Sequence, residues 1–132
     1  MKEPGWLTME MVRAIHEESL TLFGGAAGVR DEALSESAVA HPQSVFAYAD
    51  KPTIHYLAAG YCSGIIRNHP FIDANMRAGL LAARAFLFLN GYDFDPDEAE
   101  EVNVIVELAA GNIDEDALGE WFKSNTTRIK RR

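Results

Sequence analysis

Apolar residues along this chain recur at the three- and four-residue spacing of amphipathic helices rather than the alternation of strands. The first such pattern runs from Thr8 to Phe23, with Thr8 as the expected N-cap and Gly24-Gly25 as the stop. Its apolar positions are Val12, Ile15, Leu22 and Phe23, and the small Ser19 is an exception on the same face. This segment is therefore predicted to be a helix with one buried face.

Two further helices are expected before residue 69. The second begins after Asp31, a favourable N-cap, and is expected to end at His41-Pro42, because proline disfavours helix in the residue before it. Residues 43–51 are expected to be a short helix or an irregular connection. Pro52, a good first-turn residue, is expected to open a third helix that runs to about Asn68.

The second half of the chain contains the most apolar segment. Residues 75–91, NMRAGLLAARAFLFLNG, are apolar on nearly every side, which predicts a helix surrounded by others. Residues 97–110 and 114–122 are amphipathic, and Tyr92–Phe94 is the one place where brief strand pairing is expected. The pattern predicts an all-α fold, a single compact bundle of about six helices around a central apolar helix.

Length and charge bear on the number of domains and on the partners that the protein can bind. The 132 residues suit one domain, and we place its boundary at residues 1–127, followed by a basic tail at 128–132. That tail is expected to be a solubilising terminus, with nucleic acid or an acidic partner as the alternative. The net charge of −8 argues against duplex DNA as a partner of the domain itself.

Location follows from what the sequence lacks. Cys62 is the single cysteine, so no intrachain disulfide can form. The longest apolar stretch is too short to cross a bilayer, and the first ten residues do not resemble a signal peptide. We expect a cytoplasmic protein that does not enter the membrane.

The loop HPFIDANMR, residues 69–77, concentrates the chain's reactive side chains. Pro70 must end the preceding helix, so the amides from about Ala74 to Arg77 become the unpaired donors of the next helix and form an anion site. Arg77 adds a planar cation suited to phosphate, Asp73 a hard oxygen ligand for Mg²⁺, and His69 a base that titrates near neutrality. These groups together suit phosphoryl or nucleotidyl transfer.

A purely structural interpretation of the same loop is also open. Asp73 is a good N-cap, Arg77 is its natural ion-pair partner, and His69 suits a helix end. Residue types alone do not decide between these readings. Arg67, two residues before His69, is a candidate second cation for the phosphate.

The loop resembles the motif of the Fic/Doc (Fido) family, His-x-Phe-x-Asp/Glu-Gly/Ala-Asn-x-Arg, and the similarity extends from about Thr8 to Phe122. The stretches LFGGAAGVRDEALSESAVAHPQSVFAYAD and FLFLNGYDF resemble the death-on-curing, Doc-like branch of that family. The resemblance implies a toxin that uses ATP and Mg²⁺ to modify a hydroxyl on another protein. For the Doc-like branch it implies phosphoryl transfer to a Ser or Thr of a translation factor, elongation factor Tu.

The resemblance also assigns residue roles. His69, Asp73 and Arg77 are implied as the catalytic residues, with His69 as general base and Asp73 as the ligand of Mg²⁺. The implied nucleotide-binding residues are Arg67, Ala74, Asn75, Met76 and Arg77.

Departures from the motif bear on which activity to expect. Ala74 and Leu80 are the Doc-like choices, whereas Met76 stands where AMP-transferring members have Gly and Doc has Lys. Methionine gives neither the room of glycine nor the charge of lysine. AMP transfer to a protein hydroxyl and a catalytically inactive, antitoxin-binding homologue therefore remain alternatives to the kinase.

The resemblance also implies a partner. Many Fic proteins carry an inhibitory Ser/Thr-x-x-x-Glu element, and no Ser or Thr in this chain has Glu four residues later. Restraint is therefore expected from a separate antitoxin, whose disordered end folds as an amphipathic helix into a groove of the toxin.

Overall fold

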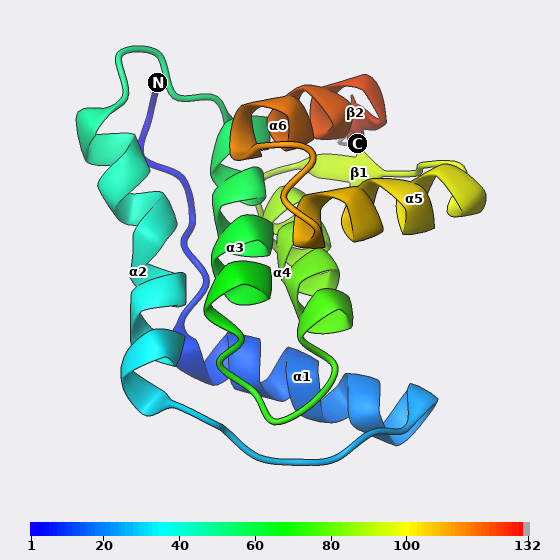
Figure 1. The fold of residues 1–132 in the computed structure, drawn as a ribbon. Helices are drawn as coiled ribbons and strands as arrows, with labels where there is room; N and C mark the ends of the chain where they lie inside the picture. The colour runs from blue at the N-terminus through cyan, green and yellow to red at the C-terminus, as the bar shows by residue number, and fades with distance from the viewer. Residues whose placement is uncertain (131–132) are drawn as a thin grey trace.

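Six helices and a two-stranded sheet make up the computed structural model, which describes residues 1–130 (Figure 1). The elements are α1 (Met9–Phe23), α2 (Glu32–Tyr48), α3 (Ile54–Asn68), α4 (Asn75–Leu89), β1 (Tyr92–Phe94), α5 (Glu98–Ala109), α6 (Glu115–Ser124) and β2 (Thr126–Arg128). The all-α prediction is confirmed. Helices α3 and α4 run side by side at the centre, α2 and α6 pack against α3, and α1 crosses below them (Figure 1).

Helix ends are fixed by the side chains that the sequence offers as caps. Thr8 caps α1 by accepting a hydrogen bond from the Met11 amide, and Asp31 caps α2 through the Leu34 amide, both as predicted. Thr53 caps α3 by accepting from the Tyr56 amide, so α3 begins at Ile54, and Pro52 lies just before the cap rather than in the first turn.

Pro42 does not end α2, which continues to Tyr48, and our prediction of a break at His41-Pro42 is wrong. The side chain of Pro42 is buried, and a Cβ on Gly60 of α3 would lie 3.4 Å from its Cγ. Pro42 has no N–H to donate to the Ala38 carbonyl, its usual partner four residues earlier in the helix. That carbonyl lies against Gly64 of α3, where a Cβ would be 3.3 Å from the oxygen. Packing of α2 on two glycines of α3 therefore outweighs the local cost of the proline.

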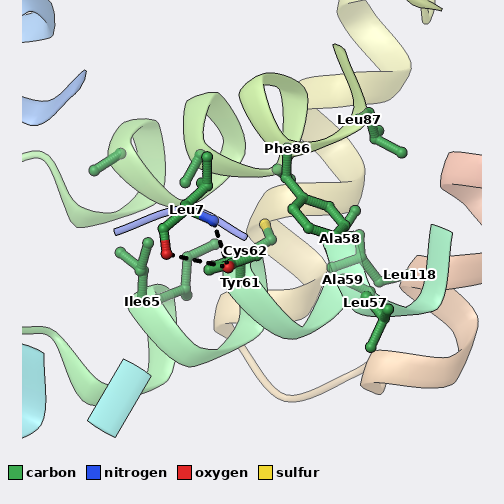
Figure 2. Packing of buried hydrophobic residues seen from close by; sticks show 14 of the residues in the cluster. Leu7, Leu57, Ala58, Ala59, Tyr61, Cys62, Ile65, Phe86, Leu87 and Leu118 are labelled. Atoms are coloured by element: carbon green, nitrogen blue, oxygen red, sulfur yellow. Dashed lines mark hydrogen bonds between the residues drawn. The ribbon is translucent and has the colours of Figure 1, made fainter. Parts of the chain in front are cut away.

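The chain before α1 is tied into the core. Leu7 donates its N–H to the buried Tyr61 hydroxyl at 2.9 Å, and that hydroxyl donates to the Leu7 carbonyl at 3.5 Å (Figure 2). The Tyr61 ring lies 5.0 Å from the ring of Phe86, so α3, α4 and the amino-terminal segment meet at one side chain.

Gly79 sets how closely α4 approaches α3. A Cβ at this position would lie 2.9 Å from the Cys62 carbonyl oxygen and 2.9 Å from Cγ1 of Ile66. The backbone carbonyl cannot move aside without shifting α3, so the crossing requires a residue without a side chain.

Gly79→Ala is expected to lower the free energy of unfolding by about 2 kcal/mol, as overpacking typically does. Gly60→Ala is the matched control, because its nearest neighbour would be at an ordinary 3.4 Å and alanine favours helix. Urea denaturation of both variants measures the difference. Equal stability of the two would show that the α3–α4 crossing is not tight.

The carboxyl end is more ordered than predicted. β2 pairs antiparallel with β1, and the Ile129 amide donates to the Gly91 carbonyl at 2.8 Å, so backbone pairing continues past residue 127, where the basic tail was expected to begin. Arg128 donates to the Tyr92 hydroxyl and lies over that ring, with its Cζ 5.3 Å from the centroid. The brief pairing expected at Tyr92–Phe94 is confirmed, and Arg131 and Arg132 lie outside the described residues.

Within residues 1–130, no helix combines the length and apolar character needed to span a membrane.

Candidate active site

His69 ends α3 in the left-handed conformation, with φ of 52°, and its amide donates to the Ile65 carbonyl at 3.1 Å. Pro70 follows and prevents the helix from continuing. The imidazole is exposed, and within residues 1–130 no hydrogen bond or ion pair holds it. His69 is therefore presented to solvent on a fixed turn of backbone.

Arg30 holds this turn from outside. Its Nε donates to the His69 carbonyl at 2.7 Å and its Nη2 to the Asn68 carbonyl at 3.0 Å. A cation at these carbonyls satisfies the free acceptors of the α3 end and is favoured by the helix dipole. The sequence alone leaves the role of Arg30 open, and the structure shows it as the cap that fixes His69.

The segment between α1 and α2 pairs with the loop through its backbone. The Arg30 amide donates to the Pro70 carbonyl at 2.7 Å, and the Ile72 amide donates to the Gly28 carbonyl at 3.0 Å. Val29 and Phe71 form an isolated antiparallel bridge between the two segments. The loop from α3 to α4 thus lies against α1 and the connection that follows it (Figure 1).

Asn75 closes the loop on itself. Its Oδ1 accepts the Phe71 amide at 3.0 Å and its Nδ2 donates to the Phe71 carbonyl at 2.9 Å, and the residue is only 3% exposed. Its side chain is therefore fully used in shaping the loop. In this conformation, the part of Asn75 that can contact a phosphate is its backbone N–H.

Asp73 is exposed and does not cap α4. Its Oδ1 accepts the Ala74 amide at 2.8 Å and its Oδ2 the Ala26 amide at 3.0 Å. The bonds from Ala26 and Ala74 hold the pKa of the Asp73 carboxyl below its usual value, and the positive charge of Arg77 adds to this effect. The carboxylate is therefore ionised at neutral pH, as a ligand of a hard cation must be.

The start of α4 is open. Its N-cap is Ala74, in the left-handed conformation with φ of 63°, and no side chain caps the helix. Among the described residues, no acceptor bonds the amides of Asn75, Met76 and Arg77. Three adjacent free N–H groups at a helix start form a site for an anion. The alternative that this loop is only a helix cap made by Asp73 does not fit this geometry.

Arg77 lies between this site and the end of α1. Its Nη1 donates to the Gly24 carbonyl at 2.8 Å and to the Ser19 carbonyl at 3.2 Å, and its Cζ lies 5.4 Å from the centroid of the Phe23 ring. No acidic residue within 1–130 forms an ion pair with it. Carbonyls hold the guanidinium in place without neutralising it, which leaves its charge for a ligand.

The structure does not bring Arg67 to the loop. Arg67 lines a separate recess between α2, α3 and α6, where His41 bonds the Glu115 carboxylate at 3.0 Å. Met76 is 39% exposed and borders a groove of about 490 Å³ between α4 and α5. Leu80 lines the same groove and packs against the core.

A bound Mg²⁺ fits the residues that are present. Within residues 1–130, no group of three or more His, Cys, Asp or Glu side chains converges as a metal cage. Magnesium that bridges nucleotide phosphates needs only one or two protein carboxylates, because phosphates and water supply the other ligands. The exposed Asp73 carboxylate beside the open helix start meets that requirement.

His16, Arg30 and the backbone of residues 24–28 support the loop, and the sequence interpretation missed them as site residues. His16 is 2% exposed, and its Nε2 lies 2.9 Å from the Asp73 carbonyl oxygen. The sequence does contain a sign of the role of His16, because the polar residues His16 and Ser19 share the buried face of α1 with Val12. Polar residues on an apolar helix face usually have partners.

The sequence matches a known protein family over most of the chain. The model of the Fic/DOC family matches residues 6–87. The chain is 38% identical to Toxin Doc of Mycolicibacterium smegmatis over 101 residues, which cover 73% of this chain and 76% of that protein. It is 28% identical to Protein kinase doc of Escherichia phage P1 over 117 residues, which cover 89% of this chain and 92% of that protein. The chain belongs to the Fic/DOC family, as its loop predicts.

Proposed function

We propose that this chain is a Doc-like toxin that transfers a phosphoryl group from ATP-Mg to a Ser or Thr hydroxyl of a translation factor, elongation factor Tu by family resemblance. The observation that carries the proposal is the uncapped start of α4 directly after the loop that exposes His69. The names of the two relatives, a toxin and a protein kinase, support it.

Five residues of the loop have a role in this reaction. The amides of Asn75, Met76 and Arg77 and the Arg77 guanidinium bind the phosphate under attack. Asp73 holds Mg²⁺, which when bound neutralises charge on the phosphates. His69 takes the proton of the target hydroxyl as its oxygen bonds to the γ-phosphorus, and ADP leaves with the electrons of the broken bond.

AMP transfer is the second candidate, and Met76 is the reason to keep it. Its uncharged side chain borders the groove at the α4 start, so it adds no positive charge for a terminal phosphate. The same loop then holds the α-phosphate, and pyrophosphate leaves. A third candidate is a homologue that binds an antitoxin without catalysis.

Radiolabelled ATP separates the three candidates. The purified protein is incubated with elongation factor Tu and ATP labelled at either the α- or the γ-phosphate. Label from the γ-position alone supports the kinase, and label from the α-position supports AMP transfer and contradicts the kinase. No label from either position, with an antitoxin helix still bound, supports the inactive homologue.

We further propose that the antitoxin helix occupies the apolar groove between α1, α4 and β1. This groove measures about 580 Å³ and begins beside Phe23, the ring that contacts Arg77. Leu22, Phe23 and Phe88 line it and are each about two-thirds exposed, at 66%, 67% and 67%. Glu18 and Asp93 also line it, which suits an amphipathic helix with basic residues at its flanks.

Phe88→Glu is expected to weaken antitoxin binding about a hundredfold, because it removes a ring worth roughly 2–3 kcal/mol of apolar burial and adds a charge. The fold should be unaffected, since Phe88 is exposed. Tyr48→Glu is the matched control, because Tyr48 is 89% exposed at the far end of α2. Calorimetric titration with an antitoxin that binds the wild-type protein measures both. Equal affinities would place the antitoxin elsewhere.

A further inference from the structure

His16 lies beneath the loop and contacts it in two ways. Its Nε2 is 2.9 Å from the Asp73 carbonyl oxygen, and its ring stacks on Phe71 with centroids 3.8 Å apart and planes 5° from parallel. A carbonyl oxygen only accepts, so Nε2 must carry the proton of this hydrogen bond. His16 is only 2% exposed, so its ring is shielded from water.

This hydrogen bond controls the direction of one peptide group. The Asp73 carbonyl and the Ala74 N–H belong to the same planar unit and point to opposite sides of it. With the carbonyl held toward His16, the Ala74 N–H points away and meets Asp73 Oδ1 at 2.8 Å. The same peptide orientation keeps Ala74 at φ of 63°, a conformation that residues with a side chain rarely adopt.

Release of this peptide would close the anion site. With Ala74 in the ordinary right-handed region, α4 would gain a residue at its start and Asp73 would become its N-cap. Aspartate is among the most favoured N-caps, and its carboxylate would then accept from the amides of the first turn. Those amides are the donors that a phosphate needs, so an ordinary cap and an anion site exclude each other here.

We propose that His16 is a positioning residue that prevents Asp73 from capping α4, and so keeps the helix-start amides free for a polyphosphate and the carboxylate free for Mg²⁺. The inference rests on the proposed function for the identity of the ligand. The conformational part of the inference, a histidine that holds Ala74 left-handed, stands on the geometry alone.

Two substitutions separate the two contacts of His16. His16→Phe keeps a ring to stack on Phe71 and removes the donor, whereas His16→Gln keeps an N–H donor at a similar reach and removes the ring. The sign of the Ala74 φ angle is read by NMR from scalar couplings and carbon shifts, without any ligand. Affinity for ATP-Mg is measured by calorimetry, and stability by thermal unfolding.

His16→Phe is expected to give Ala74 a negative φ and to bind ATP-Mg at least tenfold more weakly, with a melting temperature equal to or above that of the wild type. Because the variant gains a helix cap, its melting temperature should not fall. His16→Gln should keep the positive φ and most of the affinity. Adding Ala74→Gly to His16→Phe should restore affinity, because glycine adopts positive φ readily.

Three results would overturn the inference. One is a His16→Phe protein in which the Ala74 φ angle stays positive. If that protein does not fold, a His16→Gln protein in which the Ala74 φ angle becomes negative has the same force. Another is a loss of affinity in both variants that follows loss of stability, which would make His16 merely structural. The third is failure of glycine to rescue. A wild type that binds no ATP-Mg would refute the proposed function, while the Ala74 torsion would still decide the role of His16.

Discussion

Replacing His69 with Asn should slow transfer to the target hydroxyl by roughly 10²- to 10⁴-fold while leaving the fold and the affinity for ATP-Mg near those of the wild type. The imidazole is exposed and bonded to no described residue, so its loss should not disturb the fold. In the proposed mechanism it is the group that takes the proton of the target hydroxyl. Asparagine is the suitable replacement, because it tolerates the left-handed conformation that His69 adopts at φ of 52°.

Single-turnover transfer measured under saturating ATP-Mg tests this prediction. Calorimetry on the same variant is the control, since binding must persist for the lost rate to be assigned to proton transfer. A variant that keeps more than about a tenth of the wild-type rate would remove His69 from the role of general base.

Asp73→Asn should reduce transfer by about a hundredfold or more, because a carboxylate that holds Mg²⁺ is worth several kcal/mol of charge stabilisation during transfer. The two carboxylate oxygens accept separately from Ala26 and Ala74, and the single amide oxygen of asparagine can accept from only one of them. NMR shifts of the loop amides in the variant therefore serve as a control on the loop's shape. The pKa of Asp73 is lowered, so its carboxylate stays ionised through the neutral range and loses its charge only below the usual range of an aspartate.

Rates measured against Mg²⁺ concentration test this second prediction, and excess Mg²⁺ should restore part of the activity. Asp50→Asn is the charge-matched control, because Asp50 is exposed in the connection between α2 and α3. The same Mg²⁺ dependence in wild type and Asp73→Asn would mean that another group holds the metal.

Much of the fold follows from local signals in the sequence. Thr8 and Asp31 cap helices because their side chains reach backbone amides within one turn, which is a purely local property. Pro42 misled the prediction because its cost is set by the helix it packs on, and the glycines of α3 are eighteen or more residues away in the sequence. β2 escaped notice because its three residues, Thr126–Arg128, are all polar and show none of the apolar–polar alternation of Tyr92–Phe94.

The candidate site also has some features that the loop sequence predicts and others that depend on distant parts of the chain. The free amides of α4 follow from Pro70 and the helix start, both readable from the loop. The sequence does not show that the Asn75 side chain bonds the Phe71 backbone or that Arg67 lines a separate recess, because side-chain direction depends on the folded surroundings. The support from His16 and Arg30 spans 57 and 39 residues along the chain, beyond any local pattern.

The central claim is that the uncapped start of α4 binds a nucleotide polyphosphate, and isothermal titration of the purified protein with ATP-Mg tests it most directly. We predict a saturable heat with one site per chain that depends on Mg²⁺ and disappears when inorganic polyphosphate competes for the helix start. Absence of any heat with ATP-Mg over the millimolar range, from a protein shown to be folded, would contradict the account.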